Sequence, residues 1–394
     1  MTIRLSFNTY AIPILGLFYI LFGLGCSRND NKIKNCPKID INSEHFRETE
    51  GIFFDSIVNR VQYVLLETKP ESQLGAISSV TVADSNIIII SQGRVLVFNN
   101  EGKFLRKLGS KGRGPEEYLV PLEILYDKKK NTYTLFDYKH IIEYDSNFNF
   151  VRKIQHNPYL KKIRALPNGD FVGDIMLESF SKDSTAYSLY FFDKNFGIVK
   201  KIISRDSEER PLGKPFMNDL MGGINYSKDK LYFREQYGDT IYLITETKEI
   251  EPALLIDFGN EKFSQLLNFD FGLYEERKSM IIHLYNFTLY NDTFLTLFRY
   301  DGKNMYSLTQ IAKNYTTIPV FNDNLDKNYG FILGGFSNQL FQPYFSNGFL
   351  FGTVSAHEAK ESINDSIGTI PESIKAKIVK LNDDDNPLLI LGFY

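Results

Sequence analysis

The sequence contains no tryptophan and has only two cysteines, five histidines and a net charge of −3. Without an excess of basic residues, nothing in the charge balance favours nucleic-acid binding, so we expect no such partner. The histidines are far apart along the chain, and none has the close spacing by which a zinc site is identified in a sequence. Sugar rings would have to stack on tyrosine, because indole is absent. The sequence therefore predicts neither a metal site nor a cofactor.

An apolar stretch lies near the N-terminus. Residues 11–25 read AIPILGLFYILFGLG, follow the positive charge of Arg4 and precede the polar run SRNDNKIKN. A short apolar segment between a basic start and a sharp polar switch is typical of a secretory signal peptide. A transmembrane anchor is the alternative, and Pro13 weighs against it. We predict a signal peptide over residues 1–25.

The residues before the polar switch, GLGC, resemble a bacterial lipobox in which Cys26 is the lipidated residue. The match departs from the usual pattern at Gly23, where leucine is common. Several acyl chains on one cysteine anchor a protein stably to a membrane, and Cys36 is then left without an intrachain disulfide partner. We predict a polar tether over 26–50, a folded domain over 51–394, and an outer-membrane lipoprotein of the cell envelope, facing either side.

Short strands separated by polar turns dominate the domain, which predicts an all-β fold. A hairpin recurs, with an aromatic or β-branched strand, a polar turn and a second apolar strand. The copies span 94–108, 141–154, 189–202, 240–258 and 304–321. With two further strands before each hairpin, the period is that of a four-stranded propeller blade of about 40–50 residues. We predict a six-bladed β-propeller.

The chain ends supply the strands that close this ring. Residues 386–394 form a last strand without a partner after it, and 61–68 form an isolated strand before the first full blade. We predict that these two strands pair, because closure hides an edge that would otherwise pair with other chains. Helical spacing is found only at 371–382 and in part of an insertion at 260–280.

A glycine-rich loop, KLGSKGRGPEEYLVPLEILYD, runs from Lys107 to Asp127. A phosphate-binding loop would need a Gly-Lys-Ser/Thr triplet and a following helix, whereas a strand follows here. We predict that the glycines supply positive φ angles between two blades, and that Tyr118 wedges between them. Other loop residues at the rim of a ligand site would be Lys111, Arg113, Glu116 and Glu117.

The same loop resembles an NHL repeat. The matching positions are Gly109, Gly112, Gly114, Pro115, Tyr118, Pro121 and Asp127. Residues 61–80, residues 237–244 and the ending LNDDDNPLLILGFY are similar to the NHL-like six-bladed β-propeller lipoproteins of Gram-negative envelopes. This resemblance implies the fold and the envelope location, but no activity and no residue roles.

Two function classes are left open. A non-catalytic binding or scaffold module, with an unknown protein or glycan as ligand, is favoured because no catalytic motif is found. The alternative is a propeller enzyme, such as a lactonase, lyase or glycan hydrolase, with carboxylates near the axis. The candidate carboxylates are Asp84, Asp127, Asp137, Asp174 and Asp239. Each ends a strand or lies in a turn, so we expect each to bind backbone N–H groups, and the run 383–385 to be a solvated turn.

Overall fold

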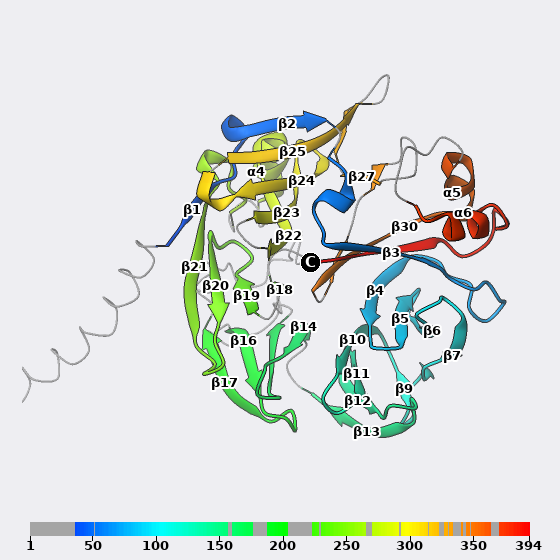
Figure 1. Cartoon of the computed structure of the whole chain (residues 1–394). Helices are drawn as coiled ribbons and strands as arrows, with labels where there is room; N and C mark the ends of the chain where they lie inside the picture. Colours follow the sequence, from blue (N-terminus) through cyan, green and yellow to red (C-terminus); the bar gives the residue numbers. More distant parts are fainter. Residues whose placement is uncertain are drawn as a thin grey trace, which may run out of the picture.

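A computed structural model describes residues 36–50, 52–156, 160–175, 187–203, 223–227, 230–264, 270–290, 293–313, 315–322, 327–329, 331–333, 340–341, 344–346, 348–363 and 370–394. Six sheets surround a central axis, and the chain is a six-bladed β-propeller, as predicted (Figure 1). The predicted signal peptide and Cys26 lie outside the described residues. None of the helices in the described part is long and apolar enough to span a membrane.

The blades follow one another along the chain, and the strands of each are named from the inner strand to the outer one. Blade 1 contains β4 (Ile77–Val82), β5 (Asn86–Ser91), β6 (Arg94–Asn99) and β7 (Phe104–Lys107). Blade 2 contains β10 (Pro121–Asp127), β11 (Thr132–Asp137), β12 (His140–Tyr144) and β13 (Phe150–Gln155). Blade 3 contains β14 (Leu160–Ala165), β15 (Phe171–Ile175), β16 (Tyr187–Phe192) and β17 (Ile198–Ile203).

The second half of the ring has the same order. Blade 4 contains β18 (Gly223–Ser227), β19 (Lys230–Arg234), β20 (Thr240–Ile244) and β21 (Ile250–Asp257). Blade 5 contains β22 (His283–Tyr290), β23 (Thr293–Tyr300), β24 (Lys303–Gln310) and β25 (Tyr315–Asn322). Blade 6 contains β29 (Tyr344–Phe345), β30 (Phe349–Val354), β31 (Leu388–Phe393) and β3 (Arg60–Leu65).

Short elements connect or extend the blades. Helix α4 (Phe271–Arg277) lies in the insertion predicted to be partly helical, and α6 (Glu372–Ile378) confirms the helix predicted at 371–382. Helix α5 (Ala356–Ser362) precedes α6 in blade 6. The remaining strands are β8 (Ser110–Lys111), β9 (Glu117–Tyr118), β26 (Lys327–Tyr329), β27 (Phe331–Ile332) and β28 (Leu340–Phe341).

The outer hairpins of blades 1–3 share one turn. In each, a side-chain oxygen accepts hydrogen bonds from the backbone N–H groups two and four residues later, and the residue three positions later has positive φ. The pairs are Asn99 with Gly102, Asp145 with Phe148, and Asp193 with Phe196. The two phenylalanines stack on Tyr133 and Phe171, both at 4.5 Å between ring centroids. This packing offsets the strain of a left-handed non-glycine residue.

The ring closes between the two ends of the domain. Strand β3 pairs antiparallel with β31, from Arg60 opposite Phe393 to Leu65 opposite Leu388. The predicted pairing of 61–68 with 386–394 is therefore confirmed. Val64, Leu389 and Leu391 are buried where blade 6 packs against blade 1.

The segment before β3 differs from the prediction. Strand β1 (Lys38–Asp40) extends blade 4 by pairing parallel with β21, and β2 (Phe46–Glu50) extends blade 5 by pairing parallel with β25 (Figure 1). Ile39 and Ile41 are fully buried in the core between these blades. The tether predicted over 26–50 is thus wrong from Lys38 onward, because this part of the chain belongs to the fold.

Candidate functional site

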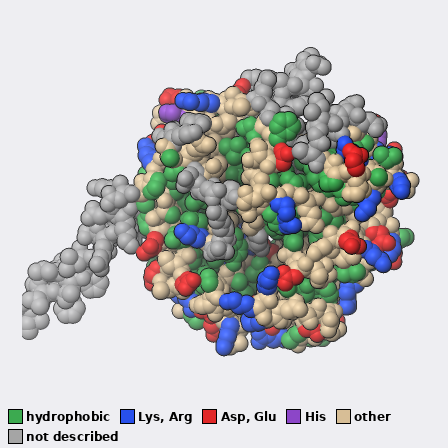
Figure 2. All heavy atoms as spheres, in the orientation of Figure 1, with side chains coloured by type: hydrophobic (Ala, Val, Ile, Leu, Met, Phe, Trp, Pro, Cys, Tyr) green, Lys and Arg blue, Asp and Glu red, His purple; other side chains and the backbone are tan. Residues whose placement is uncertain are grey.

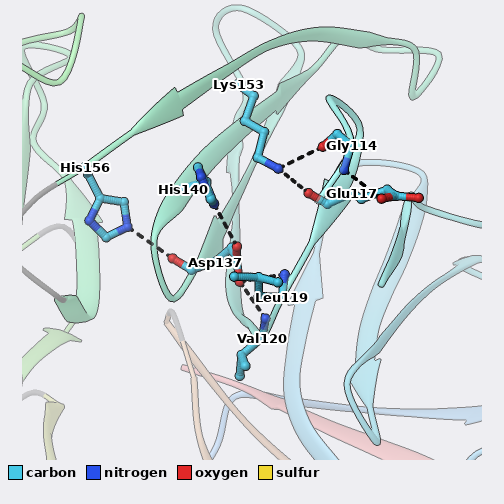
Figure 3. Close-up of polar contacts among 8 residues, drawn as sticks. All are labelled: Gly114, Glu117, Leu119, Val120, Asp137, His140, Lys153 and His156. Carbon is cyan, nitrogen blue, oxygen red and sulfur yellow. Dashed lines mark hydrogen bonds and ion pairs between the residues drawn. The ribbon is translucent and has the colours of Figure 1, made fainter. Parts of the chain in front are cut away.

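The glycine-rich loop is held by its own Glu117 side chain and by Lys153 of β13 (Figure 3). The Gly114 N–H donates to Glu117 Oε2 at 2.7 Å, and Lys153 Nζ donates to the carbonyl oxygens of Gly114 and Glu117 at 2.9 and 2.5 Å. Tyr118 is buried, and its hydroxyl accepts a hydrogen bond from the Val95 N–H of blade 1 at 3.1 Å. These bonds hold the loop between blades 1 and 2.

The prediction of positive φ along this loop is wrong at two of the three glycines. Gly109 has a φ of +61°, whereas Gly112 and Gly114 are outside the positive region. Gly112 has a different constraint: a Cβ there would lie 2.0 Å from Glu117 Oε2, so the Glu117 side chain would have to move. The absence of a side chain lets the Glu117 carboxylate approach the loop and accept its hydrogen bond.

Two of the five candidate carboxylates, Asp127 and Asp137, bind backbone N–H groups as expected, whereas Asp84 and Asp239 contact side chains instead. Asp137 is buried and accepts from the N–H groups of Leu119 and Val120 at 3.1 and 2.6 Å, while His140 lies 3.3 Å away (Figure 3). Asp127 accepts from two backbone N–H groups in its own turn. Asp84 pairs with Lys128 and Asp239 with Lys262.

The acidic residues 383–385, which precede β31, also interact with nearby groups. Asp383 pairs with Lys360 at 2.7 Å, and Asp385 accepts from the Asn382 N–H at 2.7 Å. No group of three or more metal-binding side chains occurs in the part of the chain that the structure describes. These residues therefore form an ordinary braced turn.

Asp174 is the exception among the carboxylates. It lies within β15, directly opposite Lys162 of the inner strand β14, and is 4% exposed. It lies near the end of β15 and its carboxylate accepts a hydrogen bond from the Lys162 backbone N–H, so the expected backbone contact is present. The difference from the expectation is its burial among charged side chains. We call Asp174 and the polar side chains near it on the inner strands the axial cluster. Its members are Glu123, Lys162, Arg164, Asp174 and Asn225.

The axial cluster joins three blades. Arg164 of β14 forms an ion pair with Glu123 of β10 at 2.5 Å, and both side chains are largely buried. On the other side, Lys162 Nζ lies 3.4 Å from Asn225 Oδ1 of β18. Gly223, two residues before Asn225, has a φ of +110°, and a Cβ there would lie 2.5 Å from Asp174 Oδ2. Only glycine lets the Asp174 carboxylate sit against this backbone.

The cluster shifts the pKa values of Lys162 and Asp174. Burial and the nearby Arg164 charge lower the pKa of Lys162 to about 8, although Asp174 opposes the shift. Burial raises the pKa of Asp174, while Lys161, Lys162 and Arg164 act in the opposite direction. Such shifts mark groups that are held away from bulk water and close to other charges.

Three buried atoms of the cluster lack a hydrogen-bond partner in the described structure: Arg164 Nε, Asp174 Oδ1 and Asn225 Nδ2. A buried polar atom without a partner costs about 1–3 kcal/mol. Sequence reasoning named Asp174 as a candidate but missed its neighbours, because LKKIRA, the sequence of β14, reads as an ordinary half-exposed strand. The available signal was that Lys162 and Arg164 alternate on a strand that lies at the axis.

Comparison with known proteins supports the fold. No curated protein matches the sequence. A Bacteroides fragilis protein described as exported has a similar structure, with a TM-score of 0.66 and 17% identity over 88% of this chain and 98% of that one. A DUF4221 member from Bacteroides vulgatus has a TM-score of 0.50 and 9% identity over 85% and 98%. The family model of DUF4934, a domain of unknown function, matches residues 36–392, and the chain therefore belongs to the DUF4934 family.

Proposed function

We propose that this protein is a binding module of the cell envelope that holds a small polar ligand at the axial cluster. The observation that carries the proposal is a set of three buried atoms without partners, Arg164 Nε, Asp174 Oδ1 and Asn225 Nδ2, beside the Lys162 ammonium. A ligand that supplies the missing hydrogen bonds would recover the free energy that the unliganded site lacks. Propellers commonly bind ligands near the axis, where several blades contribute side chains.

Ligand binding can be tested through thermal stability, because a compound that binds only the folded state raises the melting temperature. We would screen neutral sugars, amino acids, nucleosides and short carboxylic acids against the wild type and Lys162→Met. We expect at least one compound to stabilise the wild type and to lose this effect in the variant. A panel without any stabilising compound, or a shift that Lys162→Met leaves intact, would contradict the proposal.

The matched control is Lys200→Met. Lys200 lies on the outer strand β17, where its Nζ donates to Glu249 Oε1 at 2.5 Å on the surface. This variant removes the same charge far from the axis. We expect it to keep the ligand-induced shift of the wild type.

We also propose that the module is a lipoprotein tethered to the outer membrane through Cys26. The lipobox-like GLGC and the apolar segment before it support this location, as does the description of the Bacteroides fragilis protein as exported. Mass spectrometry of the mature N-terminus tests it, with Cys26→Ala as the variant and Cys36→Ala as the control. An intact residue 1–25 segment or an unmodified Cys26 would overturn the tether.

The enzyme alternative has one observation in its favour. The pKa of Lys162 is lowered to about 8. This value is nearer to neutral pH than that of an ordinary lysine, and a general acid or base works best when its pKa is near the ambient pH. Incubation of each stabilising compound with the wild type, followed by mass spectrometry, decides this point. Conversion by the wild type that Lys162→Met abolishes would replace the binding proposal with a catalytic one.

A further inference from the structure

A cavity of about 320 Å³ lies between blade 5 and the segment that connects β2 to β3. Strands β23, β24 and β25 form its floor, and residues 52–59 together with Tyr394 form the rest of its wall. At about 30 Å³ per water molecule it holds about ten water-sized groups, and its volume is within the range of small-molecule sites. None of its lining residues belongs to the axial cluster, so it is a separate site.

The floor of the cavity is one face of the blade 5 sheet. Thr293 of β23 lies opposite Gln310 of β24, and Leu308 of β24 lies between Leu295 and Thr317 on the neighbouring strands. Directly opposed residues of neighbouring strands point to the same face of a sheet. These five side chains therefore form one surface that is partly apolar and partly able to form hydrogen bonds.

The facing wall is fixed by its packing. Phe54 in this segment is fully buried and packs on Phe331, with ring centroids 6.5 Å apart. At the end of the segment, the Asn59 N–H donates to the Phe393 carbonyl oxygen at 2.7 Å. The side chains of Ser56 and Asn59 are exposed and line the cavity, which places them at its mouth. The cavity is therefore preformed and has a polar mouth.

The hydroxyl groups on the two faces of blade 5 differ in their partners. On the face away from the cavity they are fully buried and bond to one another, at 2.5 Å for Thr296 with Ser307 and at 2.9 Å for Thr309 with Thr316. On the cavity face, Thr293 and Thr317 are partly exposed. Their hydroxyl groups have no hydrogen-bond partner within the described part of the chain. Both are thus available to a ligand.

The cavity lacks charge. Apart from the phenol of Tyr394, none of its lining side chains in the described part of the chain is ionisable. Figure 2 shows the charged side chains over blade 5 mostly at the rim of the ring. An ion that entered the cavity would lose its hydration without gaining an opposite charge, which is costly. A hydroxyl group avoids this cost, and it can both donate to and accept from a threonine.

We propose that this cavity binds a small uncharged alcohol with an apolar body. The apolar body packs against Leu295 and Leu308, and the hydroxyl group forms a hydrogen bond with a threonine of the floor, Thr293 or Thr317. This inference goes beyond the proposed function and does not depend on it, because the cavity and the axial cluster have no residue in common.

NMR titration of the protein with 2-phenylethanol tests the proposal. Ethylbenzene is the probe without a hydroxyl group, and phenylacetate and 2-phenylethylammonium carry a charge in its place. We expect 2-phenylethanol to bind, and each ion to bind at least tenfold more weakly because the cavity offers no opposite charge.

Two variants locate the site. Thr293→Val/Thr317→Val keeps the shape of the floor, and we expect it to weaken 2-phenylethanol three- to tenfold, as for one lost hydrogen bond between neutral groups, but not ethylbenzene. Leu308→Trp fills the cavity and should abolish binding of both. The controls, Thr353→Val on the exposed side of β30 and Lys162→Met in the axial cluster, should bind as the wild type does. Circular dichroism and melting temperatures establish folding, and the double valine variant serves if Leu308→Trp does not fold.

The outcomes separate this site from the axial one. An ion that binds as tightly as 2-phenylethanol would overturn the class of ligand. Equal losses for 2-phenylethanol and ethylbenzene in the double valine variant would overturn the hydroxyl contact. Binding that Leu308→Trp leaves unchanged, or no binding of any probe, would overturn the site. Loss of 2-phenylethanol binding in Lys162→Met alone would assign the alcohol to the axial cluster instead.

Discussion

Several turns of this propeller contain a residue with positive φ, which sets the backbone conformation of the turn. In the interblade loop that residue is Gly109, where a Cβ would lie 2.8 Å from the Glu116 carbonyl oxygen and 3.0 Å from the Tyr144 hydroxyl. Glycine avoids both the backbone strain and these contacts. The loop therefore depends on one glycine for its conformation, and on Gly112 for the close approach of Glu117.

We expect Gly109→Ala to lower the free energy of unfolding by about 1–3 kcal/mol, because a non-glycine residue is strained at this φ. Urea denaturation measures the change. Gly114→Ala is the control, since its backbone is outside the positive-φ region and the nearest atom is in the flexible Glu117 side chain at 3.1 Å. Equal losses in the two variants would contradict this account of the loop.

A buried histidine gives the protein a specific sensitivity to acid. His283 packs on Phe263 with ring centroids 4.1 Å apart, lies near Tyr274, and has an Nδ1 without a partner in the described structure. Burial and the Arg299 charge lower its pKa to about 4. The unfolded chain takes up this proton near pH 6.5, before the folded protein does, so stability falls as the pH drops from 6.5 toward 4.

Between pH 6.5 and pH 4, we expect this histidine to account for up to about 3 kcal/mol of the decrease in the unfolding free energy of the wild type. The unfolding free energies of the wild type and of His283→Phe are measured across pH 4–7. The carboxylates titrate in both proteins, so the difference between the two curves isolates the contribution of His283. His357→Gln is the control, because His357 is about half exposed beside Glu361 and Asp383. A variant whose pH dependence parallels that of the wild type would show that His283 is not the cause.

At the scale of the elements, the N-terminal strands β1 and β2 act as additional outer strands of blades 4 and 5. Both pair parallel to strands more than 200 residues later in the chain. They cover the edges of β21 and β25, which would otherwise present unpaired backbone groups. Ile39 of β1 is buried in the core between the two blades, and the partly buried Phe46 of β2 packs against that core.

We expect Ile39→Ala to destabilise the protein by about 2–5 kcal/mol, as is usual when a large aliphatic side chain is removed from a core. Ile198→Ala is the control, because Ile198 lies on an outer strand and is 44% exposed. Thermal and urea unfolding of both variants make the comparison. A loss no larger than that of the control would indicate that β1 adds little to the fold.

The elements that could be predicted have sequence patterns that lie within a few neighbouring residues, whereas the others depend on strands that are distant in the sequence. Hairpins such as 94–108 were predictable because the alternation and the turn residues are local. Strand β1 was not, since Lys-Ile-Asp shows no period and its partner is distant in sequence. Asp174 follows Gly173 and resembles a turn residue, and only the juxtaposition of β14, β15 and β18 reveals its neighbours. The sequence thus predicted the fold and named Asp174 as a candidate, but it did not predict which side chains surround Asp174.

For the whole molecule, the closure by β3 determines whether the six blades unfold together. We expect a protein that begins at residue 67 to aggregate or to lose its single cooperative transition, because β31 then becomes an open edge. A protein that begins at residue 52 lacks β1 and β2 but keeps β3, and is the control that isolates the closure. Calorimetry and size-exclusion chromatography compare them, and an unchanged monomer with the same melting curve would refute the role of the closure.

The same topology has a consequence for the time at which the protein can fold. Strand β1 must wait for β21, β2 for β25, and β3 for β31 at the far end of the chain. At synthesis rates of about 5–20 residues per second, β3 stays without its partner for about 15–65 s. The ring therefore closes only after the last strand has been made, and until then the earliest strands to emerge are open to chaperones, proteases and other nascent chains.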